Sequence, residues 1–402
     1  MNFRPSHLSD AEVASGLKMV VKDGLAAEAM STFTGGAFLV AVALHLGASN
    51  FQVGLLAALP TLTNVFQLLA IWLVQRSNNR RAVTVLCSLA ARFPLLIIGA
   101  MPWLFSQGAG LMGLLFLLSF HYFFGSVAGA SWNAWMKDLV PDEILGAYYS
   151  YRTRLVQALN VILSLLLALG VDFVKARYPA YEFTAYCVMF LLGGGAGMLG
   201  VYLLARTPEP VAQPARENVV RAFRQPLKDR NFRRLLCFNA GWTFALNLAT
   251  PFFSVYMMKT LGLPLSYIVG FNVLAQLSSI CSLHMWGRYA DKYSNKNIFR
   301  VCAPVYIACI LAWAFTGMFS SRYLVIALLG LIHVLSGTSL AGINLAMGNI
   351  SIKLAPRGQA MAYLSAMNML LAASAALAPM AGGLLADSLA VHVQGWNSAR
   401  TA

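Results

Sequence analysis

Two charged side chains lie inside long apolar segments of this 402-residue chain. Glu28 is near the start of the first segment, and Arg92 is in the middle of the third. A charge in hydrocarbon costs about 2.5–3.5 kcal/mol on insertion scales, so each side chain needs a partner or a water-filled cavity. Glu28 is therefore a candidate protonatable carboxylate, or else a side chain that reaches the inner membrane surface. Arg92 is a candidate for coupling to substrate or protons, or else a structural clamp.

The position of Arg92 in its helix limits which groups can bind its guanidinium. Glu28 is the only carboxylate expected inside the bundle, and it lies toward the inner end of its helix, which places the two a few helical turns apart. We therefore expect Arg92 to bind helix carbonyls, hydroxyls or waters beside a cavity. A direct contact with Glu28 is the alternative.

Aromatic and amide side chains gather in the fourth apolar segment. His121 opens an aromatic run, and Trp132 and Asn133 stand eleven and twelve residues later. Aromatic faces with one amide suit an amphipathic organic solute, which stacks its apolar body and hydrogen-bonds a polar group. His121 has no ligand partner at helical spacing, so a core histidine is the alternative. For Trp132 the alternative is an interfacial belt beside Lys137.

Neutral polar residues also interrupt the apolar segments of the second half. Such groups either line a cavity or hydrogen-bond between helices, because their uncompensated burial is costly. The candidates are Asn239, Trp242, Asn247, Gln276, Asn344 and Asn368.

Charged residues gather in the short loops between segments. Ion pairs in such loops can stabilise alternate conformational states, because a movement of one group of helices against another breaks some pairs and forms others. A solvated loop is the alternative. The gating-loop candidates are Arg76, Arg80, Arg81, Asp138, Arg152, Gly287, Arg288, Asp291, Lys292, Lys296 and Arg357.

The composition indicates the elements that position these residues. The chain is 59% hydrophobic and 11% charged, whereas soluble domains carry about 25% charged residues. Its apolar runs do not alternate as β-barrel strands do, and it has no hydrolase, kinase, redox or metal-site motif. We predict an all-α polytopic membrane protein that is not an enzyme and uses no cofactor. The expected helices are 24–47, 51–75, 82–101, 110–136, 149–171, 183–205, 233–258, 264–287, 298–319, 323–350 and 358–386.

The basic residues predict the orientation. With the N-terminus in the cytoplasm, 23 of the 29 Lys and Arg lie on the inner side and five on the outer side, with Arg92 inside a span. This asymmetry follows the positive-inside rule and explains the net charge of +15 by attraction to an anionic inner leaflet. A nucleic-acid partner is unnecessary. We expect a monomer in the cytoplasmic (inner) membrane.

A basic, proline-rich segment divides the chain. We predict a six-helix bundle over 1–205, a cytoplasmic linker over 206–232, and a bundle of five helices plus a polar tail over 233–402. The tail after Asp387 is too short and polar to cross again. The C-terminus is therefore expected on the side opposite the N-terminus, with a twelfth helix missing.

The two bundles repeat each other. At an offset of 216, Val53-Gly54 aligns with Val269-Gly270, and Arg80 aligns with Lys296. Because six spans return the chain to the same side, the copies are parallel repeats.

The loop Gly287 to Lys296, GRYADKYSNK, resembles the G-x-x-x-D-R/K-x-G-R/K-R/K motif of major facilitator superfamily transporters of the bacterial type. Its copy at Ile71 to Arg81 is degenerate, which puts the usual ion pair of that half in doubt. Pro356-Arg357-Gly358 resembles the family's P-x-x-x-R-G loops. The resemblance covers residues 20 to 387 and implies two pseudo-symmetric bundles around a midplane site.

This resemblance implies secondary transport of a small organic solute by alternating access. We expect proton coupling, and export rather than uptake. The alternative is a non-transporting member of the same fold that acts as an assembly factor or sensor, which the degenerate loop and the missing helix would favour.

Overall fold

The computed structural model describes residues 8–77, 79–101, 110–211, 226–319, 321–355 and 360–401. The described residues form α-helices joined by short 3-10 turns and include no β-strand, which confirms the all-α class. Nine described helices are long and apolar enough to cross a membrane. They are Asp10–His45, Arg80–Gly99, Gly110–Leu139, Ala147–Arg177, Pro179–Arg206, Leu265–Ala290, Asn295–Gly317, Arg322–Ser351 and Ala366–Leu389. The division into six plus five spans stays a prediction.

The first span starts earlier than expected and contains a break. α1 (Asp10–Thr34) begins with a capping box in which the Ser9 and Glu12 side chains bind each other's backbone N–H groups. α2 (Gly36–His45) continues the span after Gly36, whose φ of +56° interrupts the helix. The expected start at residue 24 is therefore wrong, and Asp23 lies within the helix.

The second expected span, 51–75, is not one continuous helix. It consists of α3 (Asn50–Leu62), the 3-10 turn η1 (Thr63–Phe66) and α4 (Gln67–Ser77). Pro60 lies inside α3, and the Thr63 hydroxyl donates to the Leu59 carbonyl oxygen at 2.9 Å. Proline and back-bonded threonine both weaken regular helical bonding, which accounts for the 3-10 turn here.

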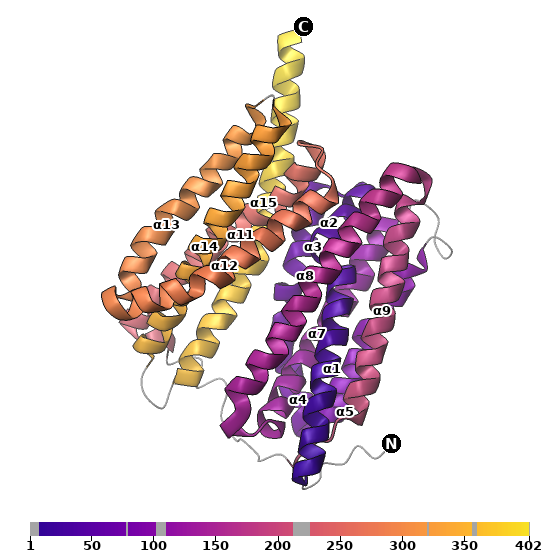
Figure 1. Cartoon of the computed structure of the whole chain (residues 1–402), viewed down its shortest axis with the longest axis vertical. Helices are drawn as coiled ribbons and strands as arrows, with labels where there is room; N and C mark the ends of the chain where they lie inside the picture. The colour runs from indigo at the N-terminus through magenta and orange to yellow at the C-terminus, as the bar shows by residue number, and fades with distance from the viewer. Residues whose placement is uncertain are drawn as a thin grey trace. The chain divides into compact units, whose positions relative to one another are not determined.

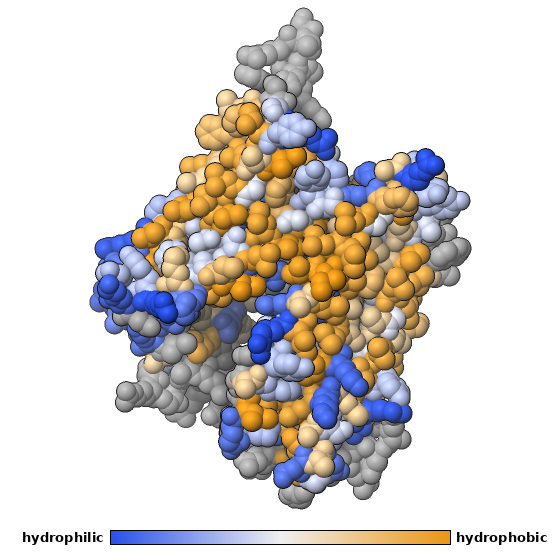
Figure 2. Space-filling view, in the orientation of Figure 1, coloured by the Kyte–Doolittle hydropathy of each residue, from blue (hydrophilic) through white to orange (hydrophobic). Residues whose placement is uncertain are grey.

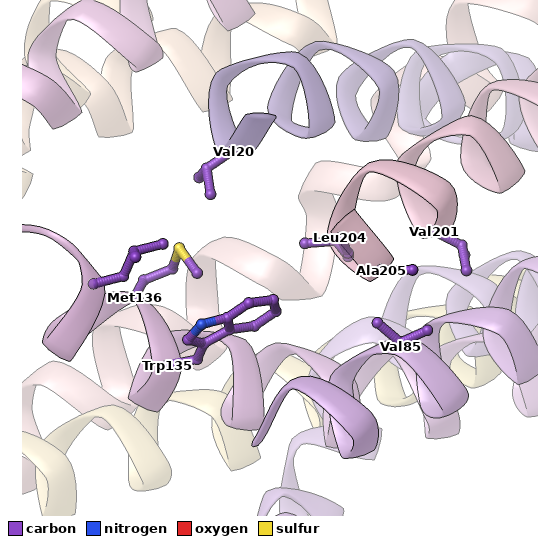
Figure 3. Close-up of a cluster of buried hydrophobic side chains, with 8 residues drawn as sticks. Val20, Val85, Trp135, Met136, Val201, Leu204 and Ala205 are labelled. Atoms are coloured by element: carbon purple, nitrogen blue, oxygen red, sulfur yellow. The ribbon is translucent and has the colours of Figure 1, made fainter. Parts of the chain in front are cut away.

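The other N-terminal helices form a packed bundle with α1. They are α5 (Arg80–Gly99), α7 (Gly110–Leu139), α8 (Leu145–Arg177) and α9 (Glu182–Arg206). α5 packs on α7 and α9, and α1 packs on α9 and α8 (Figure 1). A buried apolar cluster joins α1, α5, α7 and α9 around the fully buried Trp135 (Figure 3). Its members are Val20, Val85, Trp135, Met136, Leu139, Val201, Leu204 and Ala205.

The later helices are α11 (Arg230–Lys259), α12 (Leu265–Tyr293), α13 (Asn295–Ala312) with η5 (Trp313–Gly317), α14 (Arg322–Leu354) and α15 (Ala360–Thr401). α14 packs against α12 and α13. Gly342 makes the second contact possible, because a Cβ there would lie 2.6 Å from Cys302 Sγ. α15 runs on to Thr401, so the chain after Asp387 is a helical extension and not a separate tail.

Contacts divide the chain into two compact units. The first contains Met1–Arg216, Phe244–Val255 and Ala372–Ala402, and the second contains Glu217–Thr243 and Tyr256–Leu371. The domain division at residues 205 and 233 stays a prediction. Large apolar side chains are exposed on many helices, such as Phe116 at 70% and Leu86 at 64%. Hydrophobic residues cover much of the helical surface in Figure 2, as expected where lipid is the solvent.

Candidate functional site

A buried ion pair lies inside the N-terminal bundle. Arg92 on α5 places Nη2 3.7 Å from Asp23 Oδ1 on α1, and its Nη1 donates to the Gly197 carbonyl oxygen on α9 at 2.6 Å. Asp23 is 4% exposed and Arg92 is 8% exposed. The expectation that a helix carbonyl binds Arg92 is confirmed. The expectation that Glu28 is the only carboxylate inside the bundle is wrong, because Asp23 supplies the countercharge.

Glycines on α9 make room for this pair. A Cβ on Gly200 would lie 2.5 Å from Arg92 Nη1 and 2.8 Å from Asp23 Oδ1, and one on Gly197 would lie 3.1 Å from Arg92 Cδ. His121 on α7 hydrogen-bonds the Ala91 carbonyl oxygen through Nδ1 at 2.7 Å, one residue before Arg92. His121 is thus a satisfied histidine, and Arg92 joins three helices of one bundle. This arrangement suits a structural clamp.

Glu28 lies in a different environment, between α1 and α8. Its Oε1 accepts a hydrogen bond from Asn160 Nδ2 at 2.7 Å, and the same amide group is 3.1 Å from Thr32 Oγ1. Glu28 and Asn160 are both half-buried. The carboxylate is therefore oriented by neutral groups and has no ion-pair partner among the described residues, an arrangement in which gain of a proton leaves no opposite charge unpaired.

Arg152 belongs to α8 and packs inward on its own bundle. Its guanidinium carbon lies 5.2 Å from the centre of the Trp132 ring on α7, a cation–π contact. A Cβ on Gly24 of α1 would lie 2.7 Å from Arg152 Nε. Trp132 is half-buried beneath the arginine, whereas Asn133 beside it is exposed.

Arg80 is the centre of a network of ion pairs and hydrogen bonds at the start of α5. It pairs with Asp138 at the end of α7, and its Nε lies 3.3 Å from Glu209 Oε1. Glu209 also accepts the backbone N–H groups of Arg80 and Arg81 at 2.8 and 3.1 Å, which caps α5. The N-terminal copy of the loop motif thus retains an ion pair despite its degenerate sequence. Glu209, in the expected linker, was not among the candidates.

The remaining gating candidates are mostly exposed. Arg76 lies over the Trp72 ring at 5.4 Å and Lys292 over Tyr293 at 5.1 Å, while Arg81 donates to the Ala205 carbonyl oxygen. The exposed Arg288 and Lys296 make no ion pair with a described residue. Gly287 is half-buried. The side chain of Asp291, for which we expect an ion pair or a helix-end contact, and the whole of Arg357 lie outside the described residues.

In the second unit, two polar side chains on α11, Asn239 and Trp242, each have a buried atom without a hydrogen-bond partner among the described residues. Asn239 is 1% exposed, and its Nδ2 lies 3.3 Å from Met367 Sδ on α15. Asn239 Oδ1 and Trp242 Nε1 have no hydrogen-bond partner among the described residues. Trp242 packs edge-on against Phe299 at 5.1 Å. An acceptor and a donor three residues apart on one helix face can bind a small polar group or a water.

Two exposed asparagines stand opposite apolar faces. On α14, the exposed Asn344 is nine residues from Leu335, which is 39% exposed. On α15, the exposed Asn368 is nine residues from Leu377, which is 57% exposed. Nine residues are about 2.5 turns, so each amide and its leucine point in opposite directions. If lipid covers the leucines, the amides face away from it. Asn247 and Gln276 are half-buried.

Among the described residues, no group of three or more His, Cys, Asp or Glu side chains could hold a metal ion. The site candidates are one oriented carboxylate, several amides and aromatic faces.

Known structures share this fold. The crystal structure of a single-residue mutant of the nucleoside transporter NupG is 14% identical with a TM-score of 0.68, over 93% of this chain and 90% of that one. A bacterial homologue of the human lysosomal transporter Spinster, inward-facing and unoccupied, is 15% identical with a TM-score of 0.68, over 98% and 86%. A D-xylose-proton symporter is 14% identical with a TM-score of 0.65, over 92% and 90%. At these identities the likeness concerns the fold.

No curated protein matches the sequence significantly. The sequence model of the Major Facilitator Superfamily matches residues 24–379, which is most of the chain and runs from the first expected span into the last. The chain therefore belongs to the major facilitator superfamily of membrane transporters, which are not enzymes.

Proposed function

We propose that this protein is a secondary active transporter that moves a small organic solute by alternating access. The exposed amides carry this proposal. Asn344 and Asn368 interrupt apolar helices on the sides opposite exposed leucines. An amide exposed within an apolar helix is costly unless it meets water or solute. A polar cavity would satisfy this requirement, and the neutral amides proposed to line it fit a neutral or weakly charged solute.

We further propose that Glu28 carries the coupling proton. Its partners, Asn160 and Thr32, are neutral and orient one carboxylate oxygen. The half-buried carboxylate has no ion-pair partner among the described residues, so gain of a proton leaves no cation unpaired. Arg92 is less suited to this role, because Asp23 and Gly197 already bind it inside one bundle.

For direction, we favour export across the inner membrane, with the N-terminus in the cytoplasm. The candidate lining offers aromatic faces and few charges, which suits amphipathic compounds. Such compounds cross lipid on their own, so a cell gains more from expelling them than from importing them. The basic inner loops support the orientation.

The test uses purified protein in liposomes that contain a pH-sensitive dye. Pools of nucleosides, sugars and amphipathic aromatic compounds are added, and both solute and proton movement are measured. We expect one class to drive proton flux in the wild type, and Glu28→Gln to lower that flux at least tenfold. Glu143→Gln, an exposed carboxylate in the short turn Asp142–Ile144, is the matched control and should behave as wild type.

Each result has a distinct meaning. Solute movement without protons would contradict the coupling but retain transport. Proton flux that survives Glu28→Gln would remove Glu28 from the coupling. If no solute moves with any pool, the non-transporting alternative replaces the transporter.

A further inference from the structure

One carboxylate from α15 binds the beginning of α3. Asp387 Oδ1 accepts the backbone N–H of Asn50 at 3.1 Å and its side-chain Nδ2 at 2.9 Å, and Asp387 Oδ2 accepts the N–H of Phe51 at 2.9 Å. Asn50 and Asp387 are 337 positions apart in the chain. This contact lies within the first compact unit, which includes both Asn50 and Ala372–Ala402.

The contact completes the N-terminus of α3. The first amides of a helix have no internal partner, and the helix dipole concentrates positive charge there. Ser49 Oγ accepts the Gln52 N–H at 3.3 Å. Asp387 accepts the backbone N–H groups of the two preceding residues, Asn50 and Phe51. A charged acceptor with three donors is stronger than a neutral cap. α3 therefore has a local cap of its own and a second cap that depends on α15.

Glycines bring the two backbones together at this point. A Cβ on Gly383, one turn before Asp387, would lie 2.6 Å from the Asn50 carbonyl oxygen and from Phe51 Cα. A Cβ on Gly54, one turn after Asn50, would collide with the Pro379 carbonyl oxygen. The spacing of four residues on both helices places the glycines and the hydrogen bonds on one seam. The seam is thus a specific and close helix contact.

The two helices come from different predicted repeats. α3 opens the second span of the first repeat, and Asp387 follows the last expected span of the second. Both lie on the predicted outer side. We propose that Asp387 is a latch that holds the outer side of the transporter closed by capping α3, and that each transport cycle must break this cap. The proposal rests on the alternating access proposed above.

A distance measurement between outer loops tests the latch without any substrate. Spin labels are placed at Tyr178→Cys and Tyr323→Cys, which are 51% and 86% exposed, after replacement of the six native cysteines. We expect Asp387→Asn to increase the ratio of long-distance to short-distance populations at least tenfold, equivalent to about 1.4 kcal/mol. Asn50→Ala, which removes one of the three donors, should give a smaller shift in the same direction, and Asp387→Glu should restore part of the wild-type distribution.

Glu182→Gln is the matched control. Glu182 is another outer carboxylate, and its polar partners lie away from Asp387 in the chain: Lys175 Nζ at 3.4 Å and the Tyr186 hydroxyl, which donates to it at 3.5 Å. Distributions of Asp387→Asn and Asn50→Ala that equal those of the wild type would overturn the latch. A shift in a protein that moves no solute would show that Asp387 holds the outer side closed but would contradict the transport proposal, so the two failures are distinguishable.

Discussion

Asp23 and Arg92 are two buried charges whose mutual contact favours a structural role over a role in transport. Each is costly in an apolar interior alone, and each lowers the cost of the other. Their 3.7 Å contact and the Gly197 carbonyl oxygen bind α1, α5 and α9 into one body. A charge held in this way stabilises the bundle and contributes little to transport directly.

Replacement of Arg92 alone should therefore impair folding. We expect Arg92→Met to lower the free energy of unfolding by about 3–5 kcal/mol, because it leaves the buried Asp23 without its ion-pair partner. Asp23→Leu combined with Arg92→Met should lose less than the sum of the single changes. Thermal unfolding of the purified variants in detergent checks both statements. Loss of transport with wild-type stability in Arg92→Met would assign Arg92 to the transport mechanism instead.

Ser294 has a strained backbone conformation that should lower the stability of the protein. It has φ 119° and ψ 154°, a region that is essentially restricted to glycine and costs about 1–3 kcal/mol for other residues. The family motif has glycine at this position. Ser294→Gly should raise the free energy of unfolding by about 1 kcal/mol, part of the relief being offset by chain entropy. Ser294→Ala, which keeps a Cβ, should be near neutral, and equal effects of the two changes would exclude strain.

Several residues of the site could not be predicted from residue type and spacing. Asp23 lies one residue before the apolar segment that predicts the first span, so the pattern places it outside the bundle. Asn160 has no motif, and its importance follows only from the 2.7 Å contact with Glu28. Glu209 lies after a proline in a basic, proline-rich stretch that is typical of a linker. Only an earlier helix start, or a test of which acids can reach Arg92, would have identified Asp23.

At the scale of elements, α9 contacts its neighbours through glycine. Gly200 leaves space for the Asp23–Arg92 pair, whereas a Cβ on Gly195 would meet nothing within 4 Å. Gly200→Ala should therefore destabilise the bundle by about 1–3 kcal/mol through overpacking. Gly195→Ala should stabilise it by up to about 1 kcal/mol through helix propensity. Comparison of the two unfolding midpoints tests the close approach, and an equal response would show that the pair is not enclosed by α9.

The positions of most helices followed from charge-free segments, but their interruptions did not. The break at Gly36 needs a positive φ, and glycine in an apolar helix gives no sign of which conformation it adopts. The 3-10 turn at Thr63–Phe66 depends on a side-chain hydrogen bond to Leu59. These features result from local competition for backbone groups, which hydropathy does not measure.

At the scale of the whole molecule, hydropathy predicted the all-helical membrane class correctly, and the resemblance of the Gly287 to Lys296 loop indicated the family that the sequence model confirms. Hydropathy is a property of long segments, and it averages over errors at single positions. The pairing of residues far apart in the chain, such as Asn50 with Asp387, depends on helix rotation and tilt. Neither is encoded in segment hydropathy, so the outer seam was not predicted.

The central claim is that polar residues opposite the lipid-facing leucines line a water-filled cavity. It is tested most directly by thiol labelling of single-cysteine variants in membranes with a membrane-impermeant maleimide. Asn344→Cys and Asn368→Cys report on the proposed cavity, and Leu335→Cys and Leu377→Cys report on the opposite faces of the same helices. All four positions carry exposed side chains, so exposure alone does not distinguish them.

We expect the two asparagine positions to label rapidly and the two leucine positions to remain unlabelled until detergent is added, because the thiolate that reacts forms only in water. A solute that moves in the liposome assay should slow labelling at Asn344→Cys. Labelling of the leucine positions together with protection of both asparagine positions would contradict the cavity, and with it the proposed transport route.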